Sequence, residues 1–177
     1  MVSRFSLRTV AEIGVMVGVA LVLNFFRLFQ MPQGGSVSLE MLPIFIVALR
    51  WGTAAGVVAG ALFGAAQLLF GASIYYPLQV VLDYPLAFAL LGVAGAFPRM
   101  PLLGISLGAV GRLLAHVVSG VVFFAEYAPA GTNVWVYSFG YNLTYIVPEL
   151  LLSGIAIYFL AKRPGFFAQV TRRQVQK

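Results

Sequence analysis

Long apolar runs, separated by short stretches rich in Gly, Pro and charged residues, dominate this 177-residue chain. A transmembrane helix needs about 20 apolar residues, or fewer where it is tucked inside a bundle. On this basis the pattern predicts six helical segments, at approximately residues 7–27, 38–51, 53–71, 76–97, 101–125 and 134–162. Only a tight turn at Gly52 separates the second segment from the third, so these two should be antiparallel neighbours. We expect an all-α integral membrane protein, a six-helix bundle in one domain over residues 1–177.

Composition agrees with this fold class. The chain is 61% hydrophobic and 9% charged, and its mean hydropathy is +0.96. Its net charge of +6 could indicate nucleic acid binding, but the basic residues fall mostly at helix ends and in the C-terminal segment, where membrane topology explains them better. With the N-terminus inside, the inner face carries Arg4, Arg8, Arg50, Arg99, Lys162, Arg163, Arg172, Arg173 and Lys177. Only Arg27 then lies at the outer face, which predicts an N-in, C-in topology.

Several classes of chemistry have no sequence support. The chain has no cysteine, which excludes disulfides and cysteine metal sites. It contains no Walker A sequence, no HExxH and no GxSxG motif. We therefore expect no catalytic residues, no metal and no cofactor, and the chain cannot hydrolyse ATP by itself.

The stretch from Arg112 to Glu149 places polar residues inside apolar helical sequence, where they are usually functional. On its first helix, a stripe at four-residue spacing consists of Arg112, His116 and Gly120, with Ser119 and Phe124 close to the same line. On its second helix, another stripe consists of Ser138, Asn142, Tyr145 and Glu149. The short connection at residues 126–133 makes the two helices antiparallel, so the stripes should face each other across a ligand cavity.

Proline interrupts two of the predicted helices beside carboxylates. Pro85 follows Asp83 and Tyr84, and Pro148 precedes Glu149. Because proline lacks the N–H of the helical hydrogen bond, both helices should kink, and irregular backbone at membrane depth normally lines a cavity. Counted from the outer helix ends at 1.5 Å per residue, Asp83, His116 and Asn142 lie in one layer roughly 10–14 Å deep. Arg112 and Glu149 lie deeper and at matching levels, which predicts a structural ion pair.

Structural roles are the alternative to ligand binding for several of these residues. A lone His116 is more often a packing residue than a ligand contact, and Asp83 could be a helix-to-helix hydrogen-bond partner, for example of Arg112. Most of the outer aromatic residues fit an interfacial belt, although two or three could form a stacking box beside the carboxylate. Such a box suits a flat heterocycle that is cationic or forms hydrogen bonds. Glu40 opens the second helix near the outer face, and its role stays open.

Glycines at four-residue spacing predict close helix contacts. Gly56, Gly60 and Gly64 should form an internal packing face. Gly14 and Gly18 on the first helix could meet an internal helix or a separate subunit.

Four motifs, GGSVSLEMLPIFIVALRWG, LDYPLAF, RLLAHVVSGVVFFAEYAPAG and YSFGYNLTYIVPE, resemble those of a known family. It is the thiamine-specific substrate-binding (S) component of energy-coupling factor (ECF) transporters, which are importers of the ABC class. The resemblance implies a six-helix receptor in the cytoplasmic membrane of a prokaryote. This receptor takes thiamine from outside and works with a transmembrane coupling subunit and two ATP-binding subunits. By motif, it also implies that the ligand is met by Asp83, Tyr84, His116, Gly120, Tyr137 and Asn142.

The chain differs from this family pattern at several positions. Phe124 replaces a Trp, Asp83 is a methylene shorter than the Glu of some members, and Gly14 and Gly18 match an AxxxA motif that meets the coupling subunit. The first outer loop matches loosely, so either Glu40 or Ser36 could contact the ligand.

The leading hypothesis is therefore a membrane receptor for thiamine without enzymatic activity. One alternative is an S component for another vitamin or for a thiamine precursor. The alternative from a different class is a small intramembrane enzyme that uses His116, Ser119 and Asp83.

Overall fold

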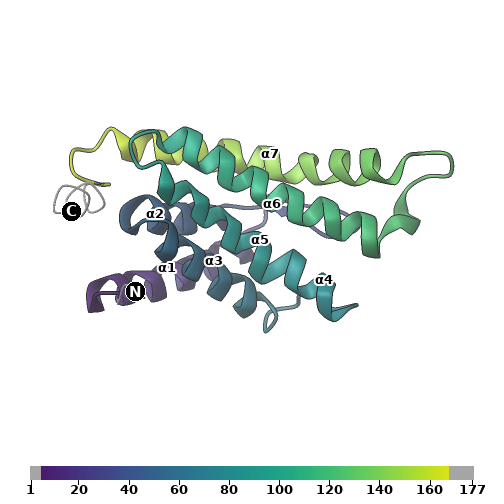
Figure 1. Cartoon of the computed structure of the whole chain (residues 1–177), viewed down its shortest axis with the longest axis horizontal. Helices are drawn as coiled ribbons and strands as arrows, with labels where there is room; N and C mark the ends of the chain where they lie inside the picture. The colour runs from purple at the N-terminus through teal and green to yellow at the C-terminus, as the bar shows by residue number, and fades with distance from the viewer. Residues whose placement is uncertain (1–4, 168–177) are drawn as a thin grey trace.

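The computed structural model describes residues 5–167 and is almost entirely helical (Figure 1). The helices run in the order α1 Leu7–Phe25, α2 Met41–Trp51, α3 Thr53–Gln67, α4 Pro77–Val81, η1 Leu82–Leu86, α5 Ala87–Leu90, η2 Leu91–Ala96, α6 Pro101–Phe123, η3 Ala125–Tyr127 and α7 Val134–Ala161. Each predicted apolar segment is helical over most of its length, which confirms the all-α prediction. Four residues of the predicted basic inner face, Arg4, Arg172, Arg173 and Lys177, lie outside the described residues.

Local sequence explains several helix ends. The Ser6 side chain accepts a hydrogen bond from Thr9 N at the start of α1, and the Asn133 side chain accepts from Trp135 N and Val136 N at the start of α7. Gly52 separates α2 from α3 with a φ of 91°, a conformation that only glycine adopts readily. The predicted tight turn at this position is confirmed.

The fourth predicted segment is helical but irregular. It begins as α4, widens into the π-helical turn η1 around Pro85, resumes as α5 and ends as the 3₁₀ helix η2. A π-turn accommodates the missing N–H of proline and re-aims the neighbouring side chains. The irregularity predicted at Asp83 is therefore present.

The helix that contains Pro148 is not broken, and a kink at this residue stays a prediction. α7 continues from Val134 to Ala161 with Pro148 inside it. The proline removes one hydrogen bond, but the rest of the 28-residue helix keeps its own bonds and packs along α6 (Figure 1). The exposed Thr144, whose carbonyl loses its usual donor, donates its own hydroxyl to Tyr141 O at 2.6 Å.

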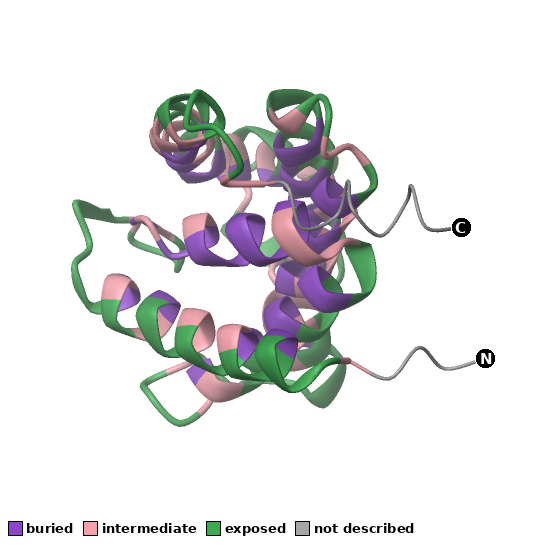
Figure 2. Ribbon diagram, turned by 90° about the vertical axis from the view of Figure 1, so that its left-hand side faces the viewer, coloured by how far each residue is buried: buried purple, intermediate pink, exposed green. Residues whose placement is uncertain are grey.

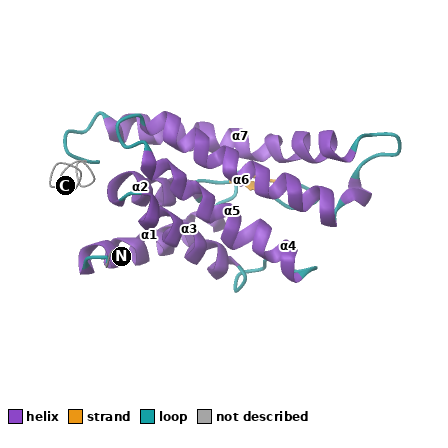
Figure 3. Ribbon diagram, in the orientation of Figure 1, coloured by secondary structure: helices purple, strands orange, loops and turns teal. Residues whose placement is uncertain are grey.

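A short antiparallel hairpin, β1 Phe29–Gln30 and β2 Ser36–Val37, occupies the first outer connection (Figure 3). The second predicted helix therefore begins at Met41 rather than at residue 38. Two-residue strands carry too few positions to show an alternating pattern, so these strands could not be predicted.

Small residues allow the centre of the bundle to pack closely. A Cβ on Gly60 would lie 2.0 Å from the carbonyl oxygen of Phe88, and one on Gly64 would lie 2.4 Å from the carbonyl oxygen of Tyr84. The predicted internal packing face of α3 is thus confirmed, and it lies directly behind η1 and α5. Figure 2 shows the buried residues on the helix faces turned toward one another, with exposed faces outside.

Within residues 5–167, four stretches are long and apolar enough to cross a membrane: Leu7–Phe25, Pro77–Ala96, Pro101–Phe123 and Val134–Ala161. α2 and α3 are shorter apolar helices. The start of α1 and the end of α7 lie at the same end of the bundle (Figure 1), where Arg50 pairs with Glu12 at 2.5 Å and donates to Phe166 O at 2.7 Å. This placement agrees with the N-in, C-in topology, which stays a prediction together with the number of crossings.

Candidate ligand-binding site

A cavity of about 470 Å³ lies at the end of the bundle that carries the hairpin loop and residues 70–75, away from the pair between Arg50 and Glu12. Its walls come from η1, α6 and α7, its outer rim from the hairpin loop and residues 70–75, and its floor from side chains at the start of α2 and on α6. Glycine allows the rim to close, since Gly35 has a φ of 87° and a Cβ there would lie 2.6 Å from the ring of Tyr145. The irregular backbone of η1 thus lines a cavity, as expected of such backbone within a membrane.

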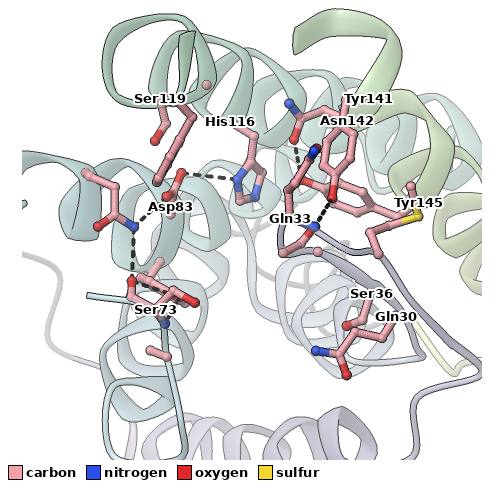
Figure 4. A pocket seen from close by; sticks show the side chains of 18 of the residues that line it. Gln30, Gln33, Ser36, Ser73, Asp83, His116, Ser119, Tyr141, Asn142 and Tyr145 are labelled. Atoms are coloured by element: carbon pink, nitrogen blue, oxygen red, sulfur yellow. Dashed lines mark hydrogen bonds and ion pairs between the residues drawn. The ribbon is translucent and has the colours of Figure 1, made fainter. Parts of the chain in front are cut away.

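Asp83 lies on η1 and faces α6 across this cavity (Figure 4). Its Oδ2 accepts a hydrogen bond from Gln79 Nε2 at 2.7 Å, and its Oδ1 lies 3.4 Å from His116 Nδ1. The proposed alternative partner, Arg112, pairs with other carboxylates instead. One oxygen of Asp83 is therefore held by its own helix, and the other is directed toward the opposite wall.

The contacts of His116 define its tautomer. Arg112 Nε donates to His116 Nε2 at 3.3 Å, so Nε2 is an acceptor and carries no proton. The proton of the ring then resides on Nδ1 and points at Asp83 Oδ1. His116 in this state is neutral and orients the carboxylate without neutralising its charge.

Arg112 joins two carboxylates at the floor of the cavity. Its guanidinium lies 2.9 Å from Glu149 Oε2 and 3.2 Å from Glu40 Oε1, and all three residues are almost completely buried. The predicted ion pair with Glu149 is confirmed, and Glu40 makes it a triad. Ser38 Oγ donates to Glu149 at 3.4 Å and Gln67 Nε2 donates to Glu40 at 3.3 Å, so the remaining carboxylate oxygens also have donors.

The α7 wall is built around a contact that requires Gly120. A Cβ on Gly120 would lie 2.2 Å from Ser138 Oγ, which in turn donates to Val117 O at 3.1 Å. Asn142 Nδ2 donates to Ser138 O at 2.8 Å, and the Tyr145 hydroxyl donates to Asn142 Oδ1. The two polar stripes predicted from the sequence therefore do meet.

Aromatic rings surround the outer half of the cavity. Tyr75 contacts Phe124 edge-on at 5.6 Å between centroids, and Phe124 stacks against Tyr127 at 6.0 Å. On the other side, Tyr137 donates to Gln33 Oε1 at 2.8 Å and Tyr141 donates to Gly34 O at 2.9 Å. These two bonds fasten the hairpin loop to α7.

The structure brings all the predicted ligand contacts to this one cavity: Glu40, Asp83, Tyr84, His116, Gly120, Phe124, Tyr137 and Asn142. Ser36 lines it as well, so the choice between Ser36 and Glu40 stays open. Their contact with a ligand remains a prediction. Gly14 and Gly18 lie elsewhere, on the exposed face of α1, and a Cβ at either would have no heavy atom within 4 Å.

Among the cavity residues that were not predicted as ligand contacts, two carry unsatisfied polar atoms. Gln67 Oε1 and Ser119 Oγ are buried, line the cavity and have no hydrogen-bond partner. Unsatisfied buried polar atoms are rare and indicate a missing partner. The position of Ser119 could have been predicted, because Ser119 lies on the same helix stripe as His116. Nothing in the sequence near Gln67 indicated that the Gln67 side chain faces Glu40.

A membrane-embedded helical bundle with a polar, aromatic-rimmed cavity defines a membrane protein that binds a small ligand. The chain belongs to the thiamine transporter family: the family model described as "Thiamine transporter protein (Thia_YuaJ)" matches residues 10–167. It is therefore a multi-pass membrane protein of a transporter family and not an enzyme. The alternative of an intramembrane enzyme that uses Ser119 also has no geometric support, because the Ser119 hydroxyl forms no hydrogen bond to a base.

Individual relatives agree with the family model. The chain is 38% identical to "Thiamine transporter ThiT" of Bacillus subtilis over 168 residues, which cover 84% of this chain and 88% of that protein. It is 34% identical over 151 residues to "Thiamine transporter ThiT" of Lacticaseibacillus paracasei, covering 69% and 75% of the two chains. A solved structure of ThiT from Listeria monocytogenes superposes with a TM-score of 0.81 at 30% identity, over 91% of this chain and 97% of that chain.

Proposed function

We propose that this chain is the thiamine-binding S component of an ECF-type importer and that thiamine occupies the cavity between η1, α6 and α7. The observation that carries this proposal is the charge of the cavity. The half-buried Asp83 and the buried Glu40 line the cavity, and Glu149 lies behind its floor. The Arg112 guanidinium pairs with Glu40 and Glu149, and His116 is neutral, so Asp83 has no cationic partner there. The exposed Arg27 lies only at the rim.

Excess negative charge in a low-dielectric cavity is costly, so the site should bind a cation. Thiamine carries a permanent positive charge on a flat thiazolium ring. Asp83 lines the cavity with its Oδ1 beside His116, and Phe124, Tyr75 and Tyr127 provide aromatic faces for stacking and cation–π contact. The free Ser119 hydroxyl and the Gln67 carbonyl can bind the polar groups of the second, aminopyrimidine ring.

A neutral isostere of thiamine tests this charge argument. Replacing the thiazolium by an uncharged ring of the same shape should weaken binding to the purified protein roughly 10- to 100-fold, the range expected for an interaction with a charged group. Competition between the two compounds in an equilibrium binding assay measures the ratio. Equal affinities would show that the carboxylates do not select the cation.

The partner subunits are part of the same proposal. The sequence contains no nucleotide-binding motif, so energy for uptake must come from elsewhere, and the family resemblance implies a transmembrane coupling subunit and two ATP-binding subunits. The exposed face of α1 is the best candidate for the contact, because Gly14 and Gly18 leave an open surface that another helix can approach closely.

Substituting both α1 glycines should separate binding from uptake. Gly14→Leu with Gly18→Leu fills the open surface, and we expect thiamine uptake by cells that hold all subunits to fall at least about tenfold, since close helix approach is lost. Thiamine binding by the purified protein should stay within twofold of the wild type. Gly140→Leu is the matched control, because Gly140 is an exposed helical glycine on α7 with equally open surroundings. Loss of folding in the double variant would instead make the two glycines part of the internal packing.

A further inference from the structure

Gln79 uses every hydrogen-bonding position of its side-chain amide. Its Nε2 donates to Asp83 Oδ2 at 2.7 Å and to Ser73 O at 3.2 Å, and its Oε1 accepts from Tyr75 N at 3.1 Å and from Tyr76 N at 3.4 Å. The residue is only 1% exposed. Two of its four bonds therefore cap the start of α4, and the other two join the outer loop to the carboxylate of the cavity.

The loop that Gln79 holds forms part of the cavity rim. Gly71, Ala72, Ser73 and Tyr75 line the cavity, and Tyr75 and Tyr76 contact Phe124 and Phe123 at the end of α6. Tyr84, next to Asp83, supports the same point of the loop, since Ser73 N donates to its hydroxyl at 2.8 Å. Figure 4 shows Ser73 and Asp83 on the same side of the cavity, with Asp83 directed at His116.

We propose that Gln79 is a positioning residue for thiamine binding, an inference that rests on the proposed function. It holds Asp83 Oδ2 so that Oδ1 keeps its position beside His116 at the cavity surface, and it ties the same carboxylate to the rim formed by residues 71–75. A cation bound at Oδ1 is then stabilised by a carboxylate of fixed orientation, because the donor on Oδ2 prevents the group from rotating away. Its dissociation also requires the rim to open against the Gln79 bonds.

A purely structural role predicts something different. If Gln79 served only as the cap of α4, a glutamate would replace it well, because a carboxylate at this position accepts from the backbone N–H groups and is favoured near a helix N-terminus. The Gln79→Glu side chain keeps the acceptor for Tyr75 N and Tyr76 N but removes both donors. It also places a second carboxylate against Asp83, where the two either repel or share a proton.

The experiment compares Gln79→Glu, Gln79→Met and the control Leu78→Met, whose side chain lies on the same helix and is 60% exposed. Each purified variant is tested for its thiamine dissociation constant, its thiamine dissociation rate and the hydrogen exchange of the Tyr75 and Tyr76 amides. For Gln79→Glu we expect both amides to stay protected, the dissociation constant to rise at least about tenfold and the dissociation rate to rise with it. Gln79→Met should show the same weakening together with faster exchange, and Leu78→Met should match the wild type.

Thiamine binding by Gln79→Glu within twofold of the wild type would overturn the positioning role. Should that variant fail to fold, Gln79→Met, which introduces no charge, decides by the same twofold criterion. A wild-type protein that does not bind thiamine would count against the proposed function itself, so the two failures are distinguishable.

Discussion

Replacing Arg112 by Met should cost about 3–5 kcal/mol of folding free energy, the range for removing one partner of a buried ionic group. Arg112 is 3% exposed and is the cation that separates Glu40 from Glu149. Without it, two carboxylates are left facing each other in a low-dielectric interior. For a chain of this length the loss corresponds to a fall in melting temperature of at least about 6 °C.

The control for this variant is Arg50→Met. Arg50 pairs with Glu12 at the inner end of the bundle, where both side chains are 16% exposed, so water can solvate the remaining carboxylate. We expect a clearly smaller fall in the melting temperature. Adding Glu40→Gln and Glu149→Gln to Arg112→Met should recover most of the stability, since no uncompensated charge then remains. An Arg112→Met protein with the same melting temperature as the wild type would show that the triad of Arg112, Glu40 and Glu149 does not stabilise the fold.

Asp83→Asn should weaken thiamine binding by about 1.5–3 kcal/mol, the range for a hydrogen bond that involves a charged group. Asp83 presents two acceptor oxygens, one to Gln79 Nε2 and one to His116 Nδ1. An asparagine has a single acceptor, so one of these donors loses its partner while the negative charge near the ligand also disappears. Both effects weaken thiamine binding.

Equilibrium titration of the folded variant with thiamine measures this change. Glu126→Gln is the matched control, because Glu126 is an exposed carboxylate in η3 that does not line the cavity. The thiamine dissociation constant of Glu126→Gln should equal that of the wild type. Asp83→Asn with the wild-type dissociation constant would remove Asp83 from the ligand site.

The sequence predicted the parts of this architecture that depend on local pattern. Apolar runs identified the helical segments, Pro85 identified the irregular turn, and four-residue spacing identified the stripes that carry Arg112, His116 and Asn142. These features depend on residues that are close in the chain, so they can be predicted from the spacing of apolar and polar positions.

Other features depend on contacts between distant segments. Glu40 joins Arg112 across 72 positions, and Gln67 then turns its amide toward Glu40, so neither role could be predicted from neighbouring residues. Pro148 failed as an indicator of a break because packing on α6 keeps α7 continuous. Gln79 lies only four positions from Asp83, yet its bonds to Ser73 O and Asp83 Oδ2 depend on how the outer loop folds.

A calorimetric titration of the purified chain with thiamine, in the absence of any other subunit, tests the central claim most directly. The account predicts one saturable site per chain, with thiamine recovered unchanged afterwards and with weaker binding in Asp83→Asn. A titration without saturable heat, or thiamine binding that requires a second subunit, would contradict the claim that this cavity alone is the thiamine receptor.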